Sequence, residues 1–415
     1  MSNSTATTPL SALLHHAPFV RYWLGRMGGV TANQMLMVAV AWHMYDITSS
    51  PWDLGLVGLF QFVPALLMAL PAGHVADRVH RGRIFACSLA AQATVAAVML
   101  LSTHYGTATR ELILLLSVVL GIARAFQMPA QQAILPSLVP QTLLPRAIAL
   151  NASGMEIAVI SGPALGGLIY TLGAQWVYTT CIVLLSIAIT LILAVDYSHK
   201  PPPAAQGWQG FFAGVAFVWR RKVVLGATTL DLFAVLLGGA TALLPIYAKD
   251  ILHTGPIGLG VLRSSPAIGA FCMSLALARW PLHRKVGAKL LSAVAIFGLA
   301  IVIFGLSTSF FVSMLALIVT GAADCVSVVV RGSLVQLETP DDMRGRVAAV
   351  NSIFIGASNQ LGEFESGATA AMWGPVTSVV AGGVGTMLIA ATWLKLFPAL
   401  AQRDHMEPHK EAAKT

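Results

Sequence analysis

The hydrophobic pattern of the chain consists of long apolar runs separated by short polar connections. Each run has about 20 mostly apolar residues, which is the length that an α-helix needs to cross a bilayer. Strands of a membrane barrel would instead show segments of about ten residues that alternate between apolar and polar side chains. The pattern therefore predicts an all-α membrane protein with twelve transmembrane helices, over residues 23–46, 54–75, 84–103, 112–135, 149–171, 176–195, 223–247, 258–279, 287–307, 311–337, 347–371 and 376–397.

The composition agrees with a membrane protein and argues against an enzyme. Hydrophobic residues make up 56% of the chain and charged residues only 10%, whereas about 25% of a soluble domain is charged. The sequence has no Walker-type loop, no HExxH motif and no dinucleotide fingerprint, and no polar segment is large enough for a catalytic domain. The four cysteines lie within predicted spans without a CxxC pair, so we expect no metal site and no cofactor.

The lysine and arginine residues predict the orientation of the helices, because cytoplasmic loops are enriched in these residues. With the N-terminus in the cytoplasm, twenty of the 25 basic residues lie on the cytoplasmic side. Arg110 and Lys249 then lie outside, and Arg124, Arg263 and Arg331 lie within spans. We therefore expect both termini in the cytoplasm. Positive loops account for the net charge of +8 without a nucleic-acid partner.

The middle of the chain contains the only long polar stretch between spans, at residues 196–222. It separates a predicted six-helix half at residues 1–195 from a second at residues 223–397, which is followed by a cytoplasmic tail at residues 398–415. Three consecutive prolines make the start of this linker extended, and its later part, Phe211 to Trp219, is expected to form a short helix on the membrane surface.

The two halves resemble each other at an offset of 200 residues. Proline, arginine and asparagine recur at this spacing together with glycine and alanine, which indicates an internal duplication. Transporters built from such repeats bind their substrate between the repeats, near the middle of the membrane. The matching pairs are Gly121 with Gly321, Pro140 with Pro340, Arg146 with Arg346, Ala149 with Ala349, Asn151 with Asn351, Gly162 with Gly362, and Gly167 with Gly367.

The most diagnostic segment lies between the second and third predicted spans, where residues 73–83 read GHVADRVHRGR. Gly73 would allow a neighbouring helix to approach closely. Asp77 could accept hydrogen bonds from the amides at the N-terminus of another helix. Arg78, Arg81 and Arg83 would pair with carboxylates or with lipid head groups.

This loop resembles the signature loop of the major facilitator superfamily. The whole chain is similar to that superfamily, and more narrowly to the branch that contains the enterobactin exporter and macrolide-type efflux proteins. The resemblance implies a twelve-helix fold in two pseudo-symmetric halves, and a latch role for the loop on the cytoplasmic side, between the second and eleventh spans. The other stretches that carry it are Leu54 to Val57, Pro129-Ala130, Leu135-Pro136, Gly162 to Gly167, Leu244-Pro245 and Thr339 to Val347.

The fifth span contains a Gly-Pro-x-x-Gly-Gly string formed by Gly162, Pro163, Gly166 and Gly167. It resembles the antiporter motif of exporters in the same superfamily, which implies efflux rather than uptake. The proline removes a backbone hydrogen bond and bends the helix. The glycines would let this span pack tightly against its symmetry-related helix, although glycine and proline also occur in ordinary membrane kinks.

Eight charged residues lie inside the predicted spans, away from the span ends, where charge is costly and indicates function. Five are acidic, and a carboxyl group in a low-dielectric environment can bind a proton. An ion pair that only holds helices together is the alternative explanation for some of them, Arg331 above all. The proton-coupling candidates are Glu156, Asp231, Asp324 and Glu363.

Polar residues also form stripes on predicted helices, which must face water or another helix rather than lipid. One stripe follows the eleventh span, and another, which includes Gln131, follows the fourth span. The first span combines amides with methionine and aromatic residues, as an adaptable pocket would. The candidates for a substrate cavity are Asn33, Gln34, Met37, Arg124, Gln127, Arg263, Asn359 and Glu365.

Together these patterns and the resemblance predict a monomeric exporter in a bacterial inner membrane that works by alternating access, with protons as the coupling ion and lipids around it. A siderophore or a related secreted metabolite is the first candidate substrate, because Arg124 and Arg263 could bind an anion. A multidrug or macrolide efflux pump is the alternative, and a non-transporting sensor or scaffold is the alternative of another class.

Overall fold

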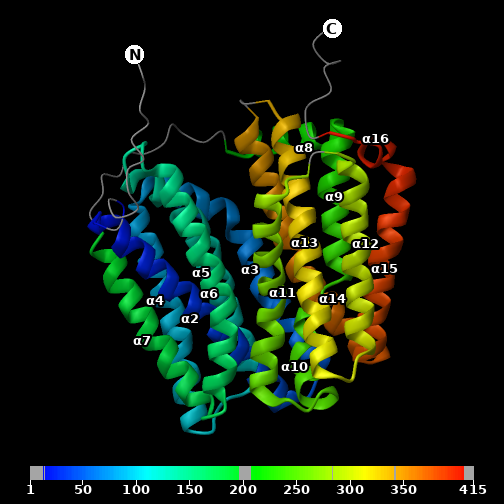
Figure 1. The fold of residues 1–415 in the computed structure, drawn as a ribbon. Helices are drawn as coiled ribbons and strands as arrows, with labels where there is room; N and C mark the ends of the chain where they lie inside the picture. The colour runs from blue at the N-terminus through cyan, green and yellow to red at the C-terminus, as the bar shows by residue number, and fades with distance from the viewer. Residues whose placement is uncertain (1–12, 14, 196–206, 283, 341–342, 406–415) are drawn as a thin grey trace. The chain divides into compact units, whose positions relative to one another are not determined.

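The computed structural model describes residue 13 and residues 15–195, 207–282, 284–340 and 343–405. Within these residues every regular element is a helix, as Figure 1 shows. The all-α prediction is therefore confirmed. The last residues of the predicted tail and the first part of the predicted linker lie outside the described residues.

Six long helices form the first half of the chain, and each covers or closely matches one predicted run. Their connections are short; Thr109, for example, caps the fourth of these helices by accepting a hydrogen bond from the amide of Leu112 at 3.3 Å, as N-cap residues do. The helices are α2 (Ala17–Thr48), α3 (Pro51–Arg78), α4 (Arg81–His104), α5 (Arg110–Leu138), α6 (Leu144–Tyr170) and α7 (Ala174–Leu193).

The second half begins with the short helix that the linker sequence predicts. This helix, α8 (Gly207–Arg220), includes Phe211 to Trp219 and packs against two later helices of the same half. The remaining α-helices of eight or more residues are α9 (Lys222–Leu237), α11 (Gly255–Arg279), α12 (Val286–Leu306), α13 (Phe310–Glu338), α14 (Arg344–Trp373) and α15 (Pro375–Leu396), followed by the short α16 (Pro398–Ala401).

The predicted run at residues 223–247 is not one continuous α-helix. After α9 ends, the chain passes through a 3₁₀ turn (η1, Ala240–Leu243), a single turn of α-helix (α10, Leu244–Ile246) and a π-helical segment (η2, Tyr247–Ile251). Two adjacent glycines, Gly238 and Gly239, lie at the break, and Pro245 cannot donate a backbone hydrogen bond. The missing side chain of Gly239 also leaves room for the backbone of Gly362 in α14.

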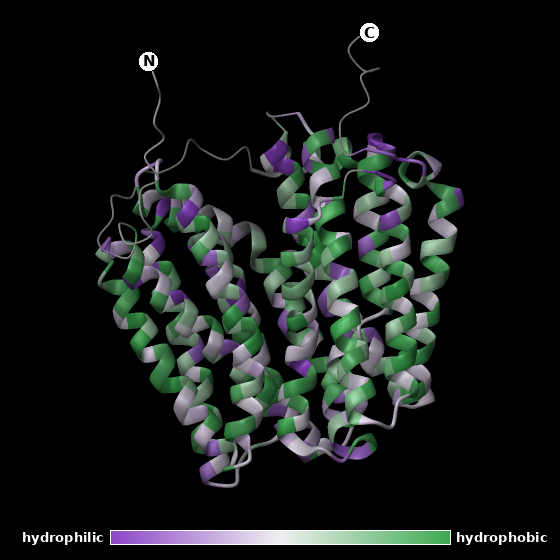
Figure 2. Ribbon diagram, in the orientation of Figure 1, coloured by the Kyte–Doolittle hydropathy of each residue, from purple (hydrophilic) through white to green (hydrophobic). Residues whose placement is uncertain are grey.

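Ten helical segments of the described chain are long and apolar enough to cross a membrane. Figure 2 shows apolar residues along most of the helix lengths, with hydrophilic residues gathered at several helix ends. The two long helices outside this set, α2 and α14, carry the polar residues of the first span and of the stripe along the eleventh. The chain is a multi-pass membrane protein, and the count of twelve spans stays a prediction.

The helices form two compact units. Unit 1 consists of residues 1–40 and 63–204, and unit 2 of residues 41–62 and 205–415. In unit 1, α4 packs along α5 and α7, and in unit 2, α12 packs along α13 and α15. Residues 41–62, the end of α2 and the start of α3, thus pack with the second half of the chain. The predicted boundaries of the two six-helix halves stay predictions.

Corresponding contacts recur inside the two units. A methyl group at Gly162 of α6 would lie 2.6 Å from Cβ of Gln34 in α2, and one at Gly362 of α14 would lie 2.9 Å from the carbonyl oxygen of Val235 in α9. Each unit therefore brings its fifth helix close to its first through a glycine, because a side chain at either glycine would collide.

A second pair of contacts joins corresponding helices in the two units, at residues that are close to the 200-residue offset but not at it. In unit 1, Cys181 of α7 donates its thiol to the carbonyl oxygen of Ala32 in α2, with a sulfur–oxygen distance of 3.4 Å. In unit 2, Thr386 of α15 donates its hydroxyl to the carbonyl oxygen of Ala234 in α9 at 3.0 Å. These matched contacts support the internal duplication that the 200-residue offset indicates.

Candidate functional site

The polar centre of unit 2 is built around an ion pair between two helices. Asp231 of α9 and Arg331 of α13 form a salt bridge between a carboxylate oxygen and a guanidinium nitrogen. Both residues are buried, with 6% and 4% of their surface exposed. A charge inside a membrane helix is costly unless it is paired, and this pair satisfies that requirement for both groups. Sequence reasoning treated Arg331 as the most structural of the eight charges, and whether the pair is only structural stays open to experiment.

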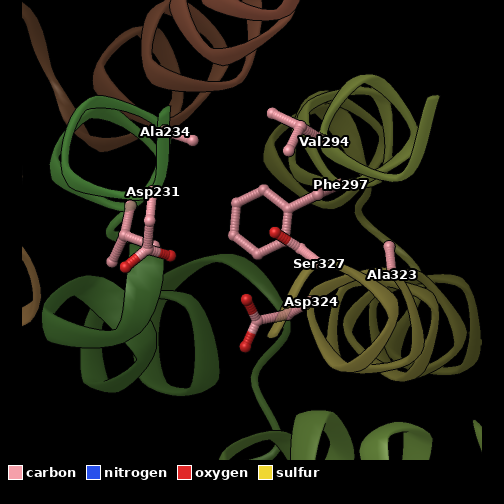
Figure 3. Close-up of a pocket in the computed structure, with 8 residues that line it drawn as sticks. Asp231, Ala234, Val294, Phe297, Ala323, Asp324 and Ser327 are labelled. Atoms are coloured by element: carbon pink, nitrogen blue, oxygen red, sulfur yellow. The ribbon is translucent and has the colours of Figure 1, made fainter. Parts of the chain in front are cut away.

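Asp324 lies on the same helix as Arg331, seven residues earlier and hence on the same face. Together with Asp231 and Ser327 it lines a small pocket. Figure 3 shows the two carboxyl groups and the serine hydroxyl directed toward a common space beside the ring of Phe297 from α12. The rest of the lining is apolar and consists of Ala234, Val235, Val294 and Ala323.

The acidic residues of α14 lie at a different place in unit 2. A methyl group at Gly58 of α3 would lie 2.9 Å from the carboxylate of Glu363, so Glu363 fills the space that this glycine leaves. Glu363 also interacts electrostatically with Arg263 of α11. Glu365 is partly buried, and Asn359 is exposed and donates to the carbonyl oxygen of Ile355 within its own helix at 2.9 Å. None of these residues lines the pocket around Asp324.

The candidates in unit 1 are mostly neutral. Gln127 of α5 accepts a hydrogen bond from Gln92 of α4 at 2.6 Å, and Gln131 accepts one at its main-chain oxygen from the Tyr22 hydroxyl, also at 2.6 Å. Arg124 is exposed on α5. The structure thus gives Gln127 and Gln131 hydrogen-bond partners within unit 1, and their role as walls of a substrate cavity stays a prediction.

The other unit 1 candidates lie on α2 and α6. Glu156 is partly buried on α6, and Asn33, Gln34 and Met37 are partly buried on α2. Of these four residues, Gln34 packs against Gly162 of the Gly-Pro-x-x-Gly-Gly string. Their assignment to a substrate cavity stays a prediction.

Two glycines of the Gly-Pro-x-x-Gly-Gly string pack against the first helix of unit 1. Methyl groups at Gly162 and Gly166 would meet Gln34 and Met35 of α2 at 2.6 and 3.0 Å. The expected contact of this string with the symmetry-related helix stays a prediction. Pro163 lies inside α6, which continues past it to Tyr170.

The signature loop is a tight connection between α3, which ends at Arg78, and α4, which begins at Arg81. Arg81 donates to the carbonyl oxygen of Ala76 at 3.5 Å, and Arg78 and Arg83 are exposed. A methyl group at Gly73 would meet nothing within 4 Å. The close approach of a neighbouring helix at Gly73 stays a prediction. The side chain of Asp77 lies outside the described residues, and the latch role stays a prediction.

Sequence reasoning missed a second polar cluster in unit 2, where the end of α2 meets the π-helical segment η2. Tyr45 donates its hydroxyl to a carboxylate oxygen of Asp250, and Lys249 pairs with Asp46. The Lys249 ammonium also lies 5.5 Å from the centre of the Tyr45 ring. The partners are more than 200 residues apart in sequence. The only sequence signal for these contacts is that two adjacent polar residues lie near the end of each of the two spans.

The first turns of α3 are fixed in the same unit through α14. Gly55 and Gly367 approach each other so closely that a side chain on either would meet the backbone of the other helix. The Trp52 and Phe364 rings pack edge to face, with their centres 5.5 Å apart. Small residues at membrane helix contacts allow such an approach. Residues 41–62 are thus attached to unit 2 by apolar and ionic contacts together.

A bundle of long apolar helices, two repeated units and buried charges are typical of a membrane transporter. The family model described as transmembrane secretion effector, within the major facilitator superfamily, matches residues 7–414. The chain belongs to this family, as the motifs predicted. It is an exporter of the major facilitator superfamily.

Similar proteins agree with this assignment. The enterobactin exporter EntS of Shigella boydii serotype 18 is 24% identical over 406 residues, which are 97% of this chain and 97% of the exporter. EntS of Escherichia coli (strain SMS-3-5 / SECEC) is 23% identical over the same shares of both chains. The similarity covers both halves and the connection between them.

Solved structures show the fold independently. A bacterial homologue of the human lysosomal transporter Spinster superimposes with a TM-score of 0.69, at 14% identity, over 94% of this chain and 97% of that one. The D323A mutant of the nucleoside transporter NupG gives a TM-score of 0.70, at 16% identity, over 92% of this chain and 100% of that one. The fold is therefore that of the major facilitator transporters.

Proposed function

We propose that this protein is a proton-driven exporter of a siderophore or a related small metabolite. In this proposal it lies in the bacterial inner membrane as a monomer with both termini in the cytoplasm. Membership of an exporter family and the full-length similarity to enterobactin exporters support the direction of transport. The asymmetric distribution of basic residues supports the orientation.

The observation that carries the proton coupling is the acidic site inside unit 2. Asp231, Asp324 and Arg331 place two carboxyl groups and one guanidinium among apolar helices. Ionisable groups within membrane helices commonly belong to proton relays and ion pathways. Because the sequence has no nucleotide-binding motif, an ion gradient is the available source of energy for uphill export.

An anionic substrate is supported by the basic residues of the helices. Arg124 is exposed on α5, and the described residues give it no salt bridge. A guanidinium is well suited to carboxylate or catecholate oxygen atoms, since it offers paired donors. The methionine and aromatic residues of α2 support lipophilic cations as the second candidate substrates.

The experiment uses inside-out membrane vesicles with an imposed proton gradient and a pH-sensitive dye. A siderophore and a lipophilic cationic drug are added in turn, and vesicles without the protein serve as the control. We expect the siderophore to dissipate the gradient only in vesicles that contain the protein. Dissipation by the cations alone would identify a multidrug pump. If neither compound dissipates the gradient while the protein is present and folded, proton-driven export of these substrates is wrong.

A further inference from the structure

The charges around the pocket of unit 2 do not balance. Arg331 supplies one positive charge, whereas Asp231 and Asp324 supply two carboxyl groups. Arg331 is bonded to Asp231, so the carboxyl group of Asp324 is the one that is left over. The site becomes electrically neutral when one proton binds, and an unbalanced charge among apolar helices is costly.

Few groups around Asp324 could compensate the negative charge of its carboxylate in place of a proton. From α9 it faces Asp231, and from its own helix it faces Arg331, and both act on it electrostatically. From α12 it faces Phe297 and Val294, which carry no charge. Ser327, of which 5% is exposed, directs its hydroxyl into the same space (Figure 3).

We propose that Asp324 carries the exchanged proton and that Arg331 acts as a switch between Asp324 and Asp231. This inference rests on the proposed proton-driven function. With the proton bound, Asp324 is a neutral carboxylic acid and Arg331 pairs with Asp231 alone. When the carboxylic acid releases the proton, Asp324 becomes a carboxylate and competes with Asp231 for the same guanidinium.

The switch is placed where it can act on the shape of unit 2. Asp231 lies on α9 only six residues before the helix ends at Leu237. The break that follows contains Gly239, which packs against the backbone of Gly362 in α14. Helix ends are positions where the backbone can absorb a conformational change. A weaker ion pair between Arg331 and Asp231 would therefore change the position of the end of α9 and its contact with α14.

The proposal predicts how substitutions of Asp324, Asp231 and Arg331 change transport. Asp324→Asn mimics the protonated state permanently. We expect this variant to lose substrate-induced dissipation of the proton gradient while it keeps the exchange of labelled for unlabelled substrate, which needs no net proton movement. Asp231→Asn with Arg331→Gln leaves Asp324 but removes the switch, so this double variant should lose proton-coupled transport as well.

The experiment measures both gradient dissipation and substrate exchange in the same vesicles. Glu111→Gln at the start of α5 is the control, because it neutralises an exposed acid outside the site, in the other unit, and it should keep both activities. Asp324→Glu should keep coupling with an altered pH dependence, and it remains informative if Asp324→Asn does not fold.

Two results would overturn the assignment. One is wild-type gradient dissipation in a folded Asp324→Asn variant, and the other is loss of substrate exchange together with coupling in that folded variant. Either result would leave the proposed function intact. The proposed function itself fails in a different way, since wild-type vesicles would then show no substrate-induced proton movement.

Discussion

Helices α5 and α13 occupy equivalent places in the two units, and they carry different chemistry. They span residues 110–138 and 310–338, so each position in one has a counterpart 200 residues later. The polar positions of α5 bear an arginine and amides, and those of α13 bear an acid, a hydroxyl and a paired arginine. The equivalent positions are Arg124 and Asp324, Gln127 and Ser327, and Gln131 and Arg331.

The packing of the units changed much less than this polar centre. The glycine contacts of Gly162 and Gly362 and the hydrogen bonds of Cys181 and Thr386 recur at matching places. The repeated contacts form the frame, since helix packing depends on shape. The polar centres were free to diverge, so that unit 1 gained hydrogen-bonding amides and unit 2 gained ionisable groups.

The largest effect is expected from breaking the ion pair that only unit 2 contains. Arg331→Gln leaves Asp231 buried without a cation, which typically costs about 3–5 kcal/mol. We expect a large fall in the melting temperature of the detergent-solubilised protein. At the equivalent position, Gln131→Leu removes an amide whose side chain makes only a 3.5 Å contact with the Met128 sulfur, and it should change stability much less.

The double variant Asp231→Asn with Arg331→Gln tests whether the pairing causes this effect. It removes both charges, so it should recover most of the stability that Arg331→Gln loses. A double variant as unstable as the single one would show that Arg331 stabilises unit 2 through other contacts.

A smaller and symmetric effect is expected from the glycines of the shared frame. Gly162→Val and Gly362→Val each force a side chain against a neighbouring helix, and overpacking of this kind costs about 1–3 kcal/mol. Melting temperatures should therefore fall by similar amounts in both variants. Gly356→Val is the control in α14, because a methyl group there meets nothing within 4 Å. If the melting temperature fell in only one of the two variants, the contacts of Gly162 and Gly362 would not be equivalent.

The sequence was sufficient to predict the helices and the family, because both depend on local patterns. Apolar runs predicted the helices, and the motifs at residues 73–83 and 162–167 predicted the superfamily. The offset between Asn151 and Asn351 predicted the repeat. Each of these signals lies within a short segment or at a constant spacing, so no knowledge of packing was needed.

The partners of the charged residues could not be predicted in the same way. Helical periodicity places Asp324 and Arg331 on one face, but it does not show that Arg331 is bonded to Asp231, one hundred residues away. The break after α9 was missed because the residues beyond it, from Ala240 to Ala248, are as apolar as a continuous span. Contacts at long sequence separation depend on how helices pack, which hydropathy does not encode.

The smallest effect is expected at the ion pair of Lys249 and Asp46. This pair lies in the same unit as the buried pair of Arg331 and Asp231, but it is much more exposed. The side chains of Lys249 and Asp46 are 35% and 40% exposed, and pairs of this kind contribute at most about 1 kcal/mol. Lys249→Gln should therefore shift the melting temperature much less than Arg331→Gln. Added salt should weaken the remaining difference further, because exposed charges are screened.

A cycle of Lys249→Gln, Asp46→Asn and the double variant measures the coupling of this pair directly. Tyr45→Phe should behave similarly, since it removes only the hydroxyl that donates to Asp250. Residues 41–62 would stay attached in each variant, because the apolar contacts of Gly55 and Trp52 with α14 remain. If Lys249→Gln lowered the melting temperature as much as Arg331→Gln does, burial would not explain the difference between the two ion pairs. The packing of the end of α2 in unit 2 would then depend on Lys249.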